Sequence, residues 1–482
     1  MLTMANVKYG EIPSAKSLKD NLKKNKKVLL LIFSIALMLR LAFSFYFQQF
    51  YFGEYTFKYK DTSTYLLPVL NLIEHGVYQG DLFLDDSKYF RMPVYPAFLG
   101  LVHTIFGAEY LDYAVAFVQS LLDAISAGLV FLIVLRISTS VSSSVISSLV
   151  YAAYPFVILW VPISYTEIVQ IFNMWTVILI ASYFRKNNLA VLIQGVLCGL
   201  LILTKQYMGV ILLVPLLSIV LTQAYHSKIK MLVYLVIGFA LPLTPWIARN
   251  YIASGNIIVL RGETTGLRSV GRDFESFYKF AALFDENVTP AVYEVAYKGT
   301  MTFTSHIDFV EKNKQDIDEA LLLAHQCGDS FVQWRKWIPI NEPPYEGCAD
   351  DVAQKFDDLR GKFWKQVNIC EALQTRIDSV KKIFLKNKLV STKIKMSKSD
   401  LLQKAIFIYR VLLLSLGVAG IILVMKKSVL PLILLSTSLS FYCYFTFVIV
   451  HAEMRYLLIP DLLITVFVGV SIAEIVNRFK QA

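Results

Sequence analysis

Long apolar runs divide this 482-residue chain and restrict it to one broad class of fold. Hydrophobic residues make up 56% of the chain and charged residues only 17%, and the hydrophobic ones are grouped into segments long enough to cross a bilayer as helices. The pattern predicts an all-α polytopic membrane protein. We expect about ten spans, at residues 28–50, 112–137, 142–160, 163–184, 189–204, 207–223, 230–248, 404–425, 429–449 and 454–476.

The positions of Lys and Arg predict the orientation of these spans, because cytoplasmic loops carry an excess of both. The basic tail at 1–27 marks the cytoplasmic side, and the short loops on that side also carry Lys and Arg, up to Arg478 and Lys480 near the C-terminus. We therefore expect both termini in the cytoplasm. Two large segments then lie outside it, at 51–111 and 250–403.

This topology predicts four parts: the tail 1–27, an N-terminal transmembrane module 28–249, an extracytoplasmic domain 250–403 and C-terminal helices 404–482. The first apolar run is too long for a signal peptide and no small-residue cleavage site follows it, so it is interpreted as an uncleaved anchor.

This orientation explains part of the net charge of +11, and anionic lipid or phosphate ligands could use the remainder. The basic residues are scattered at the ends of apolar runs, so they do not indicate nucleic acid. The domain at 250–403 is polar and is expected to be a mostly helical cap. It contains Cys327, Cys348 and Cys370. Their spacing fits no zinc motif, and it allows one disulfide with a spare thiol.

The first external segment contains two amphipathic patterns. The first begins after Asp61 and ends at Gly76, and the second follows Arg91 and ends at Gly107. Two such helices are expected to lie along the membrane surface and to hold Asp61 and Arg91 near the lipid headgroups.

Ionisable residues at the extracytoplasmic ends of the spans are the candidates for function. A carboxylate can take a proton from an acceptor hydroxyl, while Arg, Lys and His neutralise the charge that develops on a phosphate leaving group. The carboxylates and cations expected on this face are Asp61, Arg91, Glu167, Lys205, Arg249, His451, Glu453 and Arg455.

Most of these residues also have a purely structural interpretation. Asp61 precedes a helix and is in a position to cap it. Arg249 and Arg455 could be interfacial anchors, and Lys205 could be a solvated turn residue. Glu167 is different, because a carboxylate at the start of a span needs a partner or a water-filled cavity.

Arg40 and Asp123 lie deeper, each about ten residues from the outer end of its span, so their depths match at about 1.5 Å per residue. We expect them to form a buried structural ion pair between the first two spans. Apart from these two residues, we expect the charges to lie at one interface.

Eight short motifs together resemble a known superfamily. The chain looks like the GT-C glycosyltransferases that use a polyprenyl-phosphate sugar, in particular the group around protein O-mannosyltransferase and the aminoarabinose transferase of lipid A. The motifs, in the order expected for the family, are KDTSTY (60–65), RMPVYP (91–96), VQSLLDA (118–124), AAYPFVI (152–158), SYTE (164–167), GLLILTKQ (199–206), PWIARNY (245–251) and HAEMRYLLIP (451–460).

The resemblance implies a GT-C fold and assigns roles to residues. Asp61 matches a catalytic base in the first external loop, and Glu167 matches a second acidic position. The basic positions expected to hold the lipid phosphate are Arg91, Lys205, Arg249 and Arg455. Protein mannosyltransferases have an adjacent acidic pair in the first loop, whereas here Thr62 follows Asp61, so the resemblance implies neither mannose as the sugar nor protein as the acceptor.

The expected function is inverting transfer of a sugar from a polyprenyl-phosphate donor to a hydroxyl of a lipid, glycan or protein, in a prokaryotic plasma membrane. A divalent metal bridging Asp61 and Glu167 stays open as a cofactor. A transporter or lipid flippase is the main alternative, although no internal duplication is seen. A non-catalytic scaffold subunit is a third class, and it would not need these charges on one side.

Overall fold

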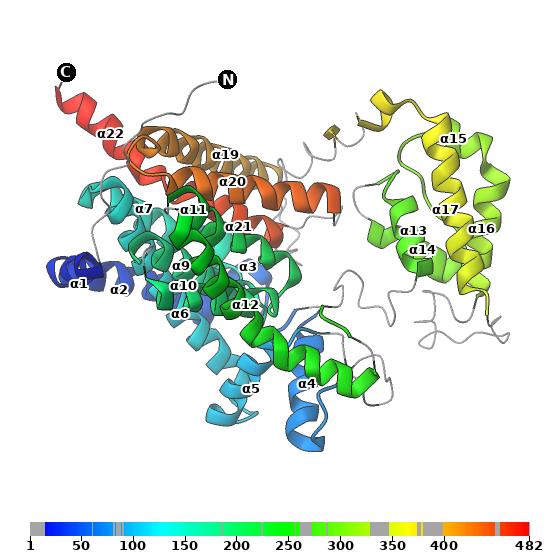
Figure 1. Ribbon diagram of the computed structural model, residues 1–482, viewed down its shortest axis with the longest axis horizontal. Helices are drawn as coiled ribbons and strands as arrows, with labels where there is room; N and C mark the ends of the chain where they lie inside the picture. Colours follow the sequence, from blue (N-terminus) through cyan, green and yellow to red (C-terminus); the bar gives the residue numbers. More distant parts are fainter. Residues whose placement is uncertain are drawn as a thin grey trace.

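The computed structural model describes residues 15–59, 61–80, 82, 88, 91–184, 187–222, 225–255, 257–260, 272–285, 288–327, 347–373, 377–378, 399–448 and 454–481. Most of these residues lie in helices, which confirms the all-α prediction. Figure 1 shows a large bundle and, at the right, a smaller group of helices.

The bundle contains helices from both ends of the chain. In chain order they are α1 (Ala15–Lys24), α2 (Lys26–Ala42), η1 (Phe43–Phe47), α3 (Gln48–Phe52), α6 (Leu111–Ser138), α7 (Val141–Ala152), α8 (Pro155–Ile158), α9 (Glu167–Tyr183), α10 (Asn188–Ile202), η3 (Gln206–Leu212), α11 (Leu213–Thr222), α12 (Tyr225–Ser254), α19 (Ser399–Val424), α20 (Leu430–Cys443), η5 (Tyr444–Val448), α21 (Met454–Thr465) and α22 (Val468–Gln481).

Six helical segments among the described residues are long and apolar enough to cross a membrane. They are Lys26–Phe52, Leu111–Ser138, Ser227–Ala253, Lys404–Val424, Leu430–Phe447 and Met454–Gln481. The other four segments predicted as spans contain shorter apolar helices of 10–17 residues.

The span predicted at 142–160 is wrong in its second half. Helix α7 ends at Ala152, and Tyr154 adopts an extended conformation with ψ of 106° before Pro155. Proline disfavours a helical conformation in the residue that precedes it, which explains the break. The chain then runs through the short α8 and an irregular buried stretch to Glu167, where α9 begins.

Small residues let the bundle helices approach closely. A Cβ atom at Gly195 of α10 would lie 2.4 Å from the Leu235 carbonyl oxygen of α12, and one at Gly238 of α12 would lie 2.1 Å from the Leu192 carbonyl oxygen. Such contact between backbones is typical of membrane helices, whose association depends on packing rather than on the hydrophobic effect.

The two amphipathic helices predicted between the first two spans are present. They are α4 (Thr62–His75) and α5 (Val94–Phe106). Gly76 and Gly107 follow them with φ of 71° and 79°, a conformation that glycine adopts without strain. Side chains such as Leu72 of α4 remain exposed, as expected for helices that lie on a membrane surface.

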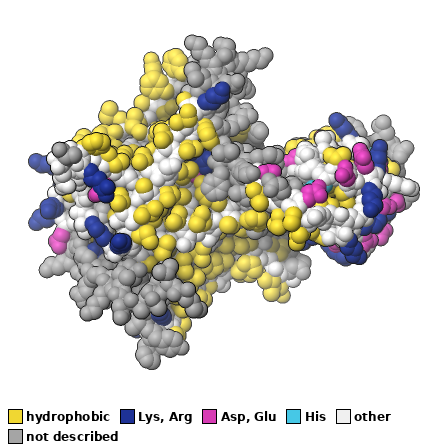
Figure 2. Space-filling view, turned by 90° about the horizontal axis from the view of Figure 1, so that it is seen from above, with side chains coloured by type: hydrophobic (Ala, Val, Ile, Leu, Met, Phe, Trp, Pro, Cys, Tyr) yellow, Lys and Arg dark blue, Asp and Glu magenta, His cyan; other side chains and the backbone are white. Residues whose placement is uncertain are grey.

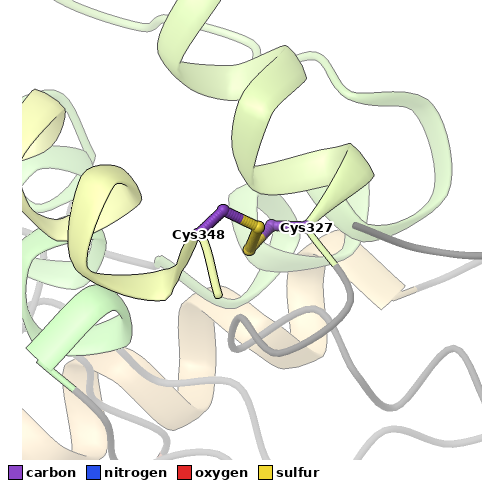
Figure 3. Close-up of a disulfide and its surroundings, with 2 residues drawn as sticks. All are labelled: Cys327 and Cys348. Carbon is purple, nitrogen blue, oxygen red and sulfur yellow. A yellow bond between two sulfur atoms is a disulfide. The ribbon is translucent and has the colours of Figure 1, made fainter. Parts of the chain in front are cut away.

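The smaller group of helices is the predicted cap. It comprises α13 (Arg272–Ala281), α14 (Val288–Lys298), α15 (Ile307–Lys312), α16 (Lys314–Gln326) and α17 (Ala349–Gln366), packed around a core of phenylalanines. A disulfide joins Cys327 and Cys348 (Figure 3), and Cys370 is a free, exposed thiol.

Surface composition differs between the two groups. Figure 2 shows hydrophobic side chains over much of the bundle, whereas acidic and basic side chains gather on the cap. The limits predicted for the cap, 250–403, overlap with two bundle helices, because α12 continues to Ser254 and α19 begins at Ser399. The Lys-rich stretch at 381–398 and Asn287, the first residue of an Asn-x-Thr sequon, lie outside the described residues.

Candidate functional site

Asp61 occupies the position before α4, yet its carboxylate makes no capping hydrogen bond. The hydroxyl of Thr62 accepts a hydrogen bond from the Tyr59 amide at 2.9 Å, so Thr62 rather than Asp61 stabilises this turn. Oδ2 of Asp61 instead lies 3.6 Å from Nη2 of Arg455, and the Asp61 side chain is 41% exposed. The carboxylate is therefore available both to a cation and to an incoming hydroxyl.

Glu167 and Lys205 form a second, buried pair. Glu167 is the first residue of α9, and Lys205 lies between α10 and η3. Nζ of Lys205 is 3.6 Å from Oε1 of Glu167, and the two side chains are only 3% and 2% exposed, so Lys205 is not the solvated turn residue considered above. Neither carboxylate oxygen of Glu167 has a hydrogen-bond partner among the described residues. This buried carboxylate is thus only loosely held.

Two tyrosines join these pairs into one group. The Tyr165 hydroxyl accepts a hydrogen bond from the Asp61 amide at 2.9 Å, and its ring lies 5.2 Å from the Arg455 guanidinium carbon. Tyr456 accepts a hydrogen bond from Arg455 at 3.1 Å, and its ring centroid lies 5.1 Å from Nζ of Lys205. We name Asp61, Glu167, Lys205 and Arg455 the outer charge cluster.

Arg91 lies three residues before α5, and its side chain packs against the N-terminal turn of α4, beside this cluster. Its Nε donates to the Thr64 hydroxyl at 2.8 Å and its Nη1 donates to the Tyr65 hydroxyl at 3.2 Å. Its guanidinium carbon lies 4.2 Å from the Tyr65 ring centroid, and that ring in turn packs against Tyr165 at 5.9 Å. The segment between α3 and α6 thus brings a third cation next to the cluster.

Arg249 is placed differently from the other predicted phosphate ligands. Its guanidinium donates to the backbone carbonyls of Tyr78 at 2.7 Å and Lys88 at 2.9 Å, and it packs on Trp246. The Tyr78 hydroxyl donates to the Arg91 carbonyl at 3.0 Å. Arg249 therefore fixes the loop that carries Arg91.

Two further predicted residues, His451 and Glu453, lie outside the described residues.

Tyr165 is 1% exposed and lies in the irregular stretch before α9.

The expected pair of Arg40 and Asp123 is present in the bundle. Nε of Arg40 lies 2.7 Å from Oδ2 of Asp123, with both side chains fully buried. The Tyr151 hydroxyl donates to the same carboxylate, and Arg40 also donates to the Ala152 carbonyl. The pair connects α2, α6 and α7 and leaves few polar atoms unpartnered, as a structural pair requires.

A second pair of this kind, between Arg410 of α19 and Asp461 of α21, corrects the prediction that the remaining charges lie at one interface. Nε and Nη2 of Arg410 donate to the two carboxylate oxygens of Asp461 at 2.6 and 3.0 Å. Tyr442 and Tyr154 donate to the same carboxylate. Both ionic residues interrupt apolar runs, and that signal could have revealed them.

The described residues contain no group of three His, Cys, Asp or Glu side chains placed to hold a metal ion. Each carboxylate of the outer charge cluster already faces a cation, so a divalent ion between them would meet Lys205 and Arg455 at close range. These residues fit an ion-paired site better than a metal site.

Two solved structures of an oligosaccharyltransferase from Archaeoglobus fulgidus resemble this chain. One, the archaeal enzyme AglB in complex with an inhibitory peptide and a dolichol-phosphate, is 13% identical, with a TM-score of 0.44 over 94% of this chain and 51% of that chain. The other, tethered to an acceptor peptide through a disulfide, is 14% identical, with a TM-score of 0.44 over 95% and 50%. This chain spans about half their length.

A comparison with curated proteins found no match. Residues 91–248 match the family described as dolichyl-phosphate-mannose-protein mannosyltransferase. These residues include the motifs that carry Arg91, Glu167 and Lys205. The family match confirms the resemblance of this membrane chain to the GT-C superfamily of glycosyltransferases.

Proposed function

We propose that this protein is an inverting glycosyltransferase that moves a sugar from a polyprenyl-phosphate donor to an acceptor hydroxyl. The observation that carries the proposal is the outer charge cluster, in which an accessible carboxylate, Asp61, lies 3.6 Å from Arg455. A base and a phosphate-binding cation are thereby next to each other, as transfer with a phosphate leaving group requires.

The loose geometry of this pair suggests how the donor binds. A phosphate offers Arg455 a stronger, charge-assisted contact than a carboxylate 3.6 Å away. We infer that the donor phosphate takes the place of Asp61 on Arg455, with Arg91 as a second cation nearby. Binding of the donor would then release Asp61 to act as the base.

The reaction follows from these positions. Asp61 takes the proton of the acceptor hydroxyl while the hydroxyl oxygen attacks the anomeric carbon from the face opposite the phosphate. The bond between the anomeric carbon and the phosphate oxygen breaks, and the polyprenyl phosphate leaves with its charge neutralised by Arg455 and Arg91. The product is a glycoside of inverted configuration.

Glu167 and Lys205 would adjust the electrostatic field around Arg455 rather than exchange protons with the substrates, because both side chains are buried. Lys205 contacts the ring of Tyr456, which also binds Arg455, so the buried pair can orient that guanidinium. No step in this reaction passes through a metal, in keeping with the cations that face both carboxylates.

The topology predicted from Lys and Arg would place the site on the extracytoplasmic face, with both termini in the cytoplasm. A prokaryotic plasma membrane fits this arrangement. The acceptor could be a lipid, a glycan or a protein, reached through the exposed side of Asp61, and the cap would stand over that entrance.

Release of polyprenyl phosphate tests this function. The purified full chain in nanodiscs is incubated with a panel of polyprenyl-phosphate sugars and extracts of envelope lipids and glycans, with Asp61→Asn as the control. The proposal predicts release of polyprenyl phosphate from at least one donor by the wild-type protein alone. If no donor is consumed but labelled lipid moves between leaflets of liposomes that contain the protein, the transporter alternative replaces it.

A further inference from the structure

Tyr165 occupies an unusual position between the parts of the outer charge cluster. It lies in the irregular stretch between α8 and α9, two residues before Glu167, and its ring packs against Trp160 at 5.5 Å and Tyr59 at 6.1 Å. This surrounding of aromatic rings fixes the orientation of the phenol.

The stretch that contains Tyr165 is attached to the first external loop by hydrogen bonds on both sides. The Ser164 amide donates to the Phe57 carbonyl at 2.9 Å, and the Thr62 hydroxyl donates to the Ser164 carbonyl at 3.3 Å. The Asp61 amide donates to the phenol oxygen of Tyr165 at 2.9 Å. The loop residue that carries the base is thereby attached to the residues that lead into α9.

The same ring also faces the cation. The guanidinium carbon of Arg455 lies 5.2 Å from the Tyr165 ring centroid, within the range of a cation–π interaction. One side chain therefore touches the backbone of Asp61 through its oxygen and the side chain of Arg455 through its face.

We propose that Tyr165 is a positioning residue that sets the separation between the Asp61 carboxylate and the Arg455 guanidinium. This inference rests on the proposed function. Its phenol oxygen holds the first turn of α4 by the Asp61 amide, and its ring holds Arg455 at the start of α21. Without the oxygen, Asp61 moves relative to Arg455 and proton removal is no longer aligned with departure of the phosphate.

The test uses Tyr165→Phe, which keeps the ring and removes only the oxygen. Tyr183→Phe is the matched control: Tyr183 lies at the other end of α9, and its hydroxyl donates to the Leu132 carbonyl at 3.1 Å and accepts from Asn21 at 3.2 Å. We expect Tyr165→Phe to lower kcat by about 10- to 100-fold with little change in KM, as loss of alignment in the transition state requires. Tyr183→Phe should leave kcat unchanged.

Amide hydrogen exchange supplies a readout that does not depend on activity. Peptides that cover residues 61–66 should exchange faster in Tyr165→Phe and not in Tyr183→Phe, because the Asp61 amide has lost its acceptor. Unchanged exchange, or unchanged kcat in an active protein, would overturn the inference. If exchange is faster in Tyr165→Phe but even the wild-type protein transfers no sugar, the proposed function is overturned, while the hydrogen bond between the Asp61 amide and Tyr165 is confirmed.

Discussion

Two sets of ion pairs in this molecule contain the same kinds of residue but differ in how completely they are satisfied. The inner pairs, Arg40 with Asp123 and Arg410 with Asp461, are in contact at 2.7 and 2.6 Å, and tyrosine hydroxyls donate to both carboxylates. The pairs of the outer charge cluster are 3.6 Å apart. Saturated pairs have little capacity for a ligand, whereas loose pairs can exchange a partner.

The completeness of its hydrogen bonding distinguishes a structural ion pair from a functional one better than its depth in the bundle or its residue types do. A buried ion pair holds helices together only when its remaining hydrogen bonds are satisfied. Glu167 is as buried as the inner carboxylates, yet its oxygens have no hydrogen-bond partner among the described residues. Such an arrangement costs stability and is retained where a site needs it.

Asp61→Asn should have the largest effect on activity of any change in the chain. We expect kcat to fall by about 10²- to 10⁴-fold because the base is lost. The melting temperature should not change, since the carboxylate is 41% exposed and caps no helix. A transfer assay and a thermal melt on the same sample check both, and a large drop in melting temperature would assign Asp61 to the structural class.

Asp461→Asn should produce the opposite pattern. It leaves the buried Arg410 without its counter-charge, and we expect the free energy of unfolding to fall by about 3–5 kcal/mol. Denaturant titration in detergent measures this. The matched control is Glu474→Gln, which breaks an exposed pair with Arg478 and should be nearly neutral. Equal stability of the two variants would refute the structural role of the inner pair.

Glu167→Gln should fall between these two cases. The amide keeps the shape but removes the charge that faces Lys205, so the field around Tyr456 and Arg455 changes. We expect kcat to fall by about 10- to 100-fold, with a smaller loss of melting temperature than for Asp461→Asn. If the melting temperature of Glu167→Gln is as low as that of Asp461→Asn and kcat is unchanged, Glu167 has a structural role and not a functional one.

Removal of divalent metals should have the smallest effect. Because cations already face both carboxylates, we expect treatment with a chelator to change the transfer rate by less than about twofold. Rates with and without added Mg²⁺ and Mn²⁺ provide the measurement. A loss of activity that added metal restores would show that a cation other than Arg455 or Arg91 neutralises the phosphate.

Much of this arrangement could be predicted from the sequence, because a charge at the edge of an apolar run needs a physical reason. That rule identified Asp61, Glu167, Lys205 and Arg455. Inside the runs, the same rule predicts the pair of Arg40 and Asp123, and it applies equally to Arg410 and Asp461, which interrupt apolar segments in the same way.

The remaining features depend on tertiary structure. Arg249 binds the carbonyls of Tyr78 and Lys88, and only the conformation of the loop brings those groups to it. Tyr165 and Tyr456 stand in the motifs SYTE and HAEMRYLLIP, but the sequence does not show that, of the 27 tyrosines, these two contact the charges. The end of α7, in contrast, was signalled by Pro155.

Binding of polyprenyl phosphate tests most directly the claim that the loosely paired cations hold a phosphate. Native mass spectrometry of the purified full chain would compare wild type, Asp61→Asn and Arg455→Ala. We predict that the lipid binds to the wild type, binds at least as tightly to Asp61→Asn because Arg455 is released from its carboxylate, and binds weakly to Arg455→Ala. Equal binding to all three forms, or binding to none, would contradict the account.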